Sequence, residues 1–195
     1  MTDAYPPGSI DALSAAYAEY CVRVGRALER QASTIDALGG AMASANAIHC
    51  YGFGRSAHAA ASLAIRLRHF QRKMPDTWWA NDQVRNPFRA GDLLISFSRE
   101  GKRFELLEYV RHARELGVVC AFVTADPVVR GGEGFLVRDG DLAIGLPAMA
   151  DPKPEFLYGG GDFELAAYFF QEVLSARIGC RFGLTDNDVK KNHVH

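Results

Sequence analysis

Five short and almost continuously apolar segments follow one another between residues 47 and 146, separated by polar turns and by stretches with helical periodicity. They do not alternate apolar with polar residues, so both faces of each strand are expected to be covered. Short buried strands that alternate with helices are typical of a parallel sheet with helices on both sides. The predicted strands are AIHCYG (47–52), TWWA (77–80), DLLISF (92–97), VVCAFVT (118–124) and DLAIGL (141–146).

Helical patterns occupy most of the remaining chain. Ser9 is a suitable N-cap for a long amphipathic helix, because apolar residues recur at three- and four-residue steps from Ile10 to Leu28. The pair Gly39 and Gly40 predicts an interruption or a bend in a second helix. After the first helix we expect helices at 34–45, 55–72, 102–116 and 162–178, with a looser segment at 127–137. The predicted fold is α/β: a doubly wound, three-layer αβα sandwich with about five parallel strands and a long N-terminal helix.

The length of 195 residues, of which 48% are hydrophobic and 23% charged, fits one globular domain with a substantial core. We expect this single domain to comprise an N-terminal helical segment (1–46), an α/β core (47–180) and a C-terminal tail (181–195). The four cysteines are widely separated and show no CxxC spacing. They fit free thiols better than a zinc site or a disulfide framework.

Charge and hydropathy exclude several classes of partner. Lysine and arginine number 22 against 23 acidic residues, a formal net charge of −1, so no nucleic-acid-binding surface is expected. No apolar run approaches the roughly 20 residues of a membrane helix, and the first residues lack the pattern of a signal peptide. We therefore expect a cytoplasmic protein whose partner is a small molecule or another copy of the chain.

The turn after the first predicted strand reads YGFGRS and has the features of an anion site. Ligands of doubly wound sheets bind beyond the carboxyl ends of the strands, near the point where strand order reverses. Gly52 and Gly54 permit a tight turn, and Arg55 and Ser56 open the next helix. Free N–H groups and the helix dipole favour an anion there.

Two other interpretations of this turn stay open. Gly52, Gly54 and Ala57 also fit the three small positions of a dinucleotide fingerprint, with Asp82 after the next strand as the ribose-binding acid. Glycines at a strand-to-helix turn can equally serve the backbone alone. A phosphate or sugar site is the interpretation that we favour, because a second anion-suited turn follows.

That second turn is SFSREGK, between the third strand and the next helix. Ser96 and Ser98 offer hydroxyl groups beside a helix N-terminus, which suits a phosphate and is not needed by a simple dinucleotide fold. Arg99 and Lys102 add positive charge. The alternative is that the serines only cap the helix.

These motifs, in this order, resemble the sugar isomerase (SIS) domain family. The resemblance rests on YGFGRS, on LISFSREG at the third strand, on FE at the start of the last long helix and on LTDNDVKKNHVH. It extends over nearly the whole chain and is greatest for the 6-phospho-3-hexuloisomerases. It implies a sugar phosphate as ligand, isomerisation of a hexulose 6-phosphate to fructose 6-phosphate without metal or cofactor, and a homo-oligomer, usually a tetramer, with a site shared between subunits.

Carried over by position, the resemblance also implies roles for individual residues. Ser96 and Ser98 match phosphate-binding serines, and Gly54, Arg55 and Ser56 match the sugar-side turn.

Two further residues match the catalytic groups of the family. Glu164 matches the base that forms an enediol, and His193 matches a tail histidine that acts as an acid or in ring opening. Each has a structural alternative, because helix dipoles favour acids in the first turn and chain ends often fray.

The second turn also departs from the family pattern. Phe97 and Arg99 stand where the family has glycines, and Gly101 stands where it has threonine. Bulky side chains here are expected to restrict the approach of a phosphate to the backbone. Two function classes therefore remain, with a nucleotide oxidoreductase as a third. One is a phosphosugar isomerase, with the hexulose phosphate or another substrate, and the other is a non-catalytic phosphosugar-binding or regulatory protein.

Overall fold

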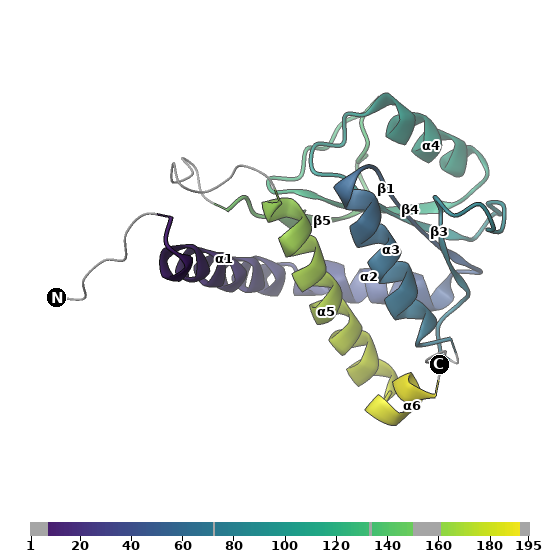
Figure 1. Ribbon diagram of the computed structural model, residues 1–195. Coiled ribbons are helices and arrows are strands. Elements are labelled where there is room, and N and C mark those ends of the chain that lie inside the picture. Colours follow the sequence, from purple (N-terminus) through teal and green to yellow (C-terminus); the bar gives the residue numbers. More distant parts are fainter. Residues whose placement is uncertain (1–7, 72, 133, 150–160, 192–195) are drawn as a thin grey trace.

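The computed structural model describes residues 8–71, 73–132, 134–149 and 161–191, and its centre is a sheet of five parallel strands (Figure 1). The strands lie in the order β2-β1-β3-β4-β5, so the chain passes from β1 to one edge and then returns beyond β1 to build the other half. Their bounds are β1 (Ile48–Gly52), β2 (Thr77–Trp79), β3 (Leu93–Phe97), β4 (Val119–Ala125) and β5 (Leu142–Leu146). The predicted parallel sheet is confirmed, with every strand end within one residue of its expected position.

The helices of the described residues are α1 (Ile10–Arg30), α2 (Ala32–Ser44), α3 (Arg55–Arg68), α4 (Phe104–Glu115), α5 (Asp162–Phe182) and α6 (Asp186–Lys190). Ser9 caps α1 as predicted, because its side chain accepts a hydrogen bond from the N–H group of Ala12. No membrane-crossing candidate exists among these helices, since none is both long and apolar enough.

Two helices differ from their expected extents. The helix α2 is not interrupted at Gly39 and Gly40, because Leu38 and Met42 beside them are buried and their packing outweighs the low helix propensity of glycine. The final long helix extends beyond the expected residue 178 and ends where Gly183 adopts a left-handed conformation. The C-terminal tail contains the short helix α6, whose start is fixed by a capping box between Thr185 and Asp188.

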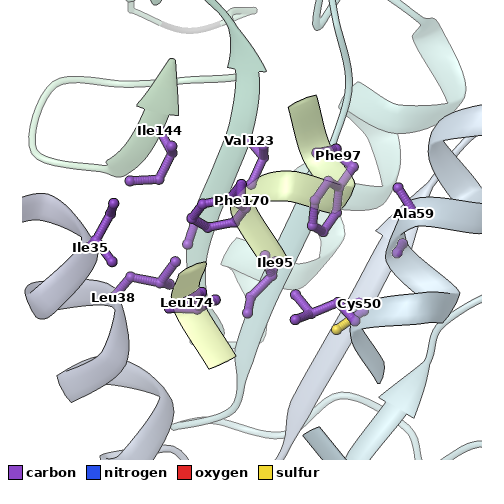
Figure 2. Close-up of a cluster of buried hydrophobic side chains, with 14 of the residues drawn as sticks. Ile35, Leu38, Cys50, Ala59, Ile95, Phe97, Val123, Ile144, Phe170 and Leu174 are labelled. Carbon is purple, nitrogen blue, oxygen red and sulfur yellow. The ribbon is translucent and has the colours of Figure 1, made fainter. Parts of the chain in front are cut away.

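The two faces of the sheet are covered unequally (Figure 1). The helices α1, α2, α3 and α5 lie on one face, which we call the four-helix face. Within the described residues α4 is the helix on the opposite face, which we call the α4 face. Figure 2 shows part of the core on the four-helix face, where Ile95, Phe97 and Val123 of the strands meet Phe170 and Leu174 of α5. Each such buried side chain contributes about 1.5–3 kcal/mol of apolar transfer free energy.

Candidate functional site

Strand order reverses between β1 and β3, whose last residues, Gly52 and Phe97, are partners in the sheet register. Beyond these strand ends lies a cleft of about 540 Å³, formed by the turns after β1 and β3 and by the first turn of α5. Open α/β sheets bind ligands at this position. Its ionisable lining residues are Arg55, Arg99, Lys102, Arg103, Glu100 and Glu164. Four bases against two acids suit an anionic ligand.

The start of α3 lies directly against the end of β1. A Cβ atom at Gly52 would be 2.5 Å from the carbonyl oxygen of Ser56, so only glycine permits this approach. Gly54 has φ of 58°, and no side chain caps the helix that follows. Side chains therefore leave the N–H groups of the first turn open, and the helix dipole favours an anion beside them.

Two predicted site residues, Ser56 and Glu164, contact each other across the cleft. The helices α3 and α5 start at the same end of the molecule and run side by side (Figure 1). The buried Ser56 hydroxyl donates a hydrogen bond of 3.2 Å to Oε1 of Glu164, which is half-buried. A hydroxyl has one hydrogen, so Ser56 cannot donate to a phosphate at the same time. In this arrangement Ser56 orients the carboxylate.

The exposed side chain of Arg55 links the same two helix starts. Its guanidinium lies beside Gly161, where a Cβ atom would be 2.7 Å from Nη2 of Arg55. Gly161 also has φ of 98°, a conformation that glycine adopts without strain. A side chain at position 161 would displace the guanidinium from the cleft rim. The glycine at position 161 therefore makes room for Arg55.

Arg99 turns toward α5 and pairs with Asp162. Its Nη1 and Nη2 atoms lie 2.6 and 3.3 Å from the two carboxylate oxygens of Asp162, which is buried. The N–H group of Met149 donates to the same carboxylate at 3.2 Å. The Tyr20 hydroxyl lies 2.8 Å from the carbonyl oxygens of both Asp162 and Pro147. Burial raises the pKa of Tyr20, so its phenol remains a neutral donor. This network fixes the first turn of α5, which carries Glu164.

The turn after β3 folds around Ser98. Its Oγ accepts a hydrogen bond of 3.1 Å from the N–H group of Gly101, which has φ of 64°. Its backbone N–H donates to Val123. Because the hydroxyl oxygen accepts this bond, its hydrogen remains to be donated to a ligand. Arg103 lies 4.5 Å over the ring of Phe53, which holds this base at the cleft.

Ser96 and Phe97 are placed differently from the other residues of this turn. Ser96 is fully buried, is absent from the cleft lining and shares the α4 face with its register partners Tyr51 and Phe122. Within the described residues its Oγ has no hydrogen-bond partner. Phe97 is also fully buried and packs near Ala59 and Phe170 beneath the cleft (Figure 2). Phe97 therefore lines the floor of the cleft as part of this core.

The predicted residues that line the cleft are Gly54, Arg55, Ser56, Ser98, Arg99, Lys102 and Glu164. His193 lies outside the described residues. Asp82, the acid of the dinucleotide alternative, accepts a hydrogen bond from the N–H group of Val84 and does not line the cleft. No cluster of three His, Cys, Asp or Glu side chains that could hold a metal ion occurs in the described part of the chain. The cleft thus combines one oriented carboxylate with cationic and N–H groups.

The comparison with protein families agrees with this geometry. The model of the SIS domain matches residues 41–151, more than half of the chain. The chain belongs to the SIS domain family. This matched SIS region contains β1 to β5 and both turns of the cleft, and it ends before α5.

Similar proteins cover most of this SIS chain. An uncharacterized protein of Archaeoglobus fulgidus is 25% identical over 156 residues, which are 77% of this chain and 81% of that protein. A Methanococcus jannaschii structure, from which a function of 3-hexulose-6-phosphate isomerase was inferred, has a TM-score of 0.77 at 21% identity and covers 95% of this chain and 99% of its own. The structure of the Vibrio vulnificus NanR protein complexed with ManNAc-6P has a TM-score of 0.67 at 16% identity. The match covers 94% of this chain and 67% of the NanR chain. At these identities the two structures show a shared fold.

Three site features of this SIS domain escaped sequence reasoning. Asp162 was not singled out. It is the first residue of α5, two residues before Glu164, and this position could have indicated a role in fixing the start of the helix. Arg103 precedes the same helix α4 as Lys102 and was equally visible as a charge. Tyr20 gave no signal, because its place in the apolar stripe of α1 did not show that its hydroxyl reaches α5.

Proposed function

We propose that the chain is a phosphosugar isomerase that moves a carbonyl group within a ketose phosphate through an enediol. The observation that carries this proposal is the Glu164 carboxylate, which Ser56 holds at 3.2 Å on the wall of a cleft lined by four basic side chains. A carboxylate in hydrogen-bonding reach of a bound sugar is a suitable base, and the bases around it suit a phosphate.

In this proposal the phosphate lies at the starts of α3 and α4. The Ser98 hydroxyl, the guanidinium of Arg55 and the ammonium of Lys102 bind its oxygens, together with N–H groups of the first helical turns. Arg99 adds charge while it remains paired with Asp162. Ser96 has no part in binding here, since its side chain is buried on the α4 face.

The proton transfers follow from this placement. Glu164 removes a proton from the carbon beside the carbonyl, which leaves an enediolate. The protonated carboxyl group then returns the proton to the neighbouring carbon, and the carbonyl forms at the adjacent position. The basic side chains of the cleft stabilise the negative charge of the intermediate. His193 is proposed as the acid that protonates the enediolate oxygen, as the resemblance to the hexuloisomerases implies. As the new carbonyl forms, the neighbouring hydroxyl returns its proton to His193, so that both groups end in their starting protonation states.

Exchange of solvent deuterium into a ketose phosphate tests the base directly. Incubation of fructose 6-phosphate with the protein in deuterium oxide is expected to label the carbon beside the carbonyl, as measured by nuclear magnetic resonance. Glu164→Gln should reduce the rate by about 10²–10⁴-fold, the usual contribution of a positioned base. Glu172→Gln is the matched control, because this acid also lies on α5 but pairs with Arg66 on an exposed surface. Equal exchange in the two variants would show that Glu164 is only a helix-end acid.

A non-catalytic phosphosugar-binding protein is the second candidate, favoured by the fold shared with NanR, which was solved with a sugar phosphate bound. It predicts that fructose 6-phosphate raises the melting temperature of the protein without any deuterium exchange. The same thermal-shift assay with NAD addresses the nucleotide alternative. Stabilisation by NAD and by no sugar phosphate would reject both phosphosugar proposals.

We also propose a homo-oligomer, in line with the family resemblance. The helix α1 extends beyond the body of the molecule in Figure 1, and its Ile10 and Val22 side chains are 77% and 55% exposed. Apolar side chains on a projecting helix suit a contact with a second copy. Sedimentation equilibrium of the whole chain measures the assembly.

A further inference from the structure

A second hollow of about 510 Å³, which we call the side pocket, adjoins the cleft at the carboxyl end of β4. Most of its lining is apolar, and the side chains that matter are Leu107, Pro127, Val129, Phe135, Leu136 and Val137. Cavities of this size hold drug-sized groups. The lining also includes Thr124, Asp126 and the three charged residues that it shares with the cleft. The apolar side chains that dominate it offer no partners to the hydroxyl groups of a sugar chain, and unpaired buried hydroxyls are costly. The side pocket therefore suits an apolar or aromatic group.

The side pocket exists because the connection from β4 to β5 forms no helix in its described residues. Parallel strands are usually joined by a helix that covers the sheet. Here the connection folds on itself through a bridge between Arg130 and Val137, and the Arg130 guanidinium donates to the carbonyl oxygens of Arg138 and Asp141. The space beside α4 that a crossover helix would fill is partly empty.

Gly101 lies where the side pocket meets the turn after β3. A Cβ atom at Gly101 would lie 2.9 Å from Cδ2 of Leu136, so the absence of a side chain lets Leu136 pack on the turn itself. The family's threonine would not fit without moving Leu136. Arg99, Glu100 and Lys102 line both hollows. Gly101 and Arg99, which depart from the family pattern in the turn after β3, thus form part of the wall and rim of the side pocket.

We infer that the side pocket binds an apolar or aromatic substituent of the same phosphorylated ligand whose phosphate lies in the cleft. Charge complementarity supports this occupant, because the rim that the hollows share carries two bases, Arg99 and Lys102, against one acid, Glu100, while most of the pocket behind them is apolar. The inference deepens the proposed function and rests on it for the phosphate end. It names the substrate class as sugar phosphates that carry an apolar group.

A pair of phosphate esters with equal charge tests the pocket. Isothermal titration calorimetry of the whole chain should show 1-naphthyl phosphate binding at least about tenfold more tightly than methyl phosphate. Burial of about 60 Å² of apolar surface is sufficient for this ratio. Inorganic phosphate should compete with 1-naphthyl phosphate, because both use the bases on the shared rim. Naphthyl phosphate binding that phosphate does not displace would overturn the inference.

Substitution of Val129 tests whether the preference for 1-naphthyl phosphate over methyl phosphate arises in the side pocket. Val129 is 64% exposed, so Val129→Trp should fold and fill the space, reducing the naphthyl preference to about parity without changing the affinity for methyl phosphate. Val129→Asp should have the same effect by placing a charge among apolar groups. Val84→Trp is the matched control, because Val84 is 78% exposed and lines neither hollow.

The outcomes separate this inference from the proposed function. Equal binding of the two esters, or the same loss in Val129→Trp and Val84→Trp, would reject the side pocket as a ligand site. A naphthyl preference that disappears only in the Val129 variants supports it. If no sugar phosphate undergoes solvent exchange while this preference persists, the isomerase proposal fails and the side pocket remains.

Discussion

The two faces of the sheet bury different chemistry. Strand side chains on the four-helix face are apolar except for Thr77 at the edge strand, whereas those on the α4 face include His49, Tyr51, Ser96 and Thr124. Four helices exclude water from one face, and α4 with irregular connections covers the other (Figure 1). The first face holds α3 and α5 rigidly, so that Ser56 and Glu164 meet. The second tolerates polar groups and leaves the side pocket. The proposed base is therefore positioned by the four-helix face, whereas the proposed ligand selectivity comes from the α4 face.

Matched deletions of a phenyl ring should give the largest effect. Phe170→Ala on the four-helix face is expected to lower the free energy of unfolding by about 5 kcal/mol, and Phe122→Ala on the α4 face by about 3 kcal/mol. Both rings are fully buried, but the neighbours of Phe122 include loops that can move into the cavity. Urea denaturation measures both values. Equal losses of unfolding free energy in the two variants would show that the two faces are equally rigid and would contradict the difference described above.

Removal of the Tyr20 hydroxyl should have an intermediate effect. Tyr20→Phe deletes a hydroxyl whose single hydrogen is shared between the carbonyl oxygens of Pro147 and Asp162, and is expected to cost about 1–3 kcal/mol, since a buried acceptor loses its partner. The same substitution should weaken deuterium exchange by loosening the start of α5. Tyr17→Phe, a partly buried tyrosine of the same helix, serves as the reference. Unchanged stability in Tyr20→Phe would mean that the hydroxyl does not hold α5.

The pH dependence of stability should be the smallest effect and should arise on the α4 face. Burial lowers the pKa of His49, although its hydrogen bond of 3.1 Å with Asp92 acts in the opposite direction. Below about pH 6.5 the unfolded chain binds a proton that the folded chain resists, so stability falls as the pH decreases. The contribution of one histidine to the slope is at most about 1.4 kcal/mol per pH unit.

Urea denaturation at pH values from 7.5 to about 5 measures this slope. His49→Gln is expected to flatten it, because glutamine cannot take up the proton. His112→Gln, an exposed histidine on α4, should leave it unchanged. A slope that persists in His49→Gln would assign the pH dependence to other groups.

The fold could be predicted from the sequence because the strands are short apolar runs bounded by polar turns. The ends of the strands follow from the positions where apolar residues give way to polar ones. Residues 127–137 were predicted to form a looser segment, and those of them that the structure describes form no helix. The position of Ser96 was predictable in principle. Neighbouring residues of a strand point to opposite faces, so the alignment of Phe97 with apolar Ile95 places Ser96 on the other side.

The candidate site was only partly predictable, because its decisive contacts join segments that are distant in sequence. Ser56 was chosen from its turn and Glu164 from its helix, but nothing local shows that they meet. The pairing of Arg99 with Asp162 was hidden for the same reason, and the arginine was expected to face the phosphate. Helix packing on the four-helix face creates both contacts.

The late position of Glu164 in the chain has a consequence for biosynthesis. The turns of the cleft are complete once β4 has paired with β3, but the carboxylate belongs to α5, which is made after the whole sheet. A nascent chain therefore completes the anion-suited turns of the cleft before its proposed base. Under the proposed function, a chain still in translation binds a sugar phosphate without acting on it, and docking of α5 through Tyr20 and Arg99 completes the proposed catalytic site.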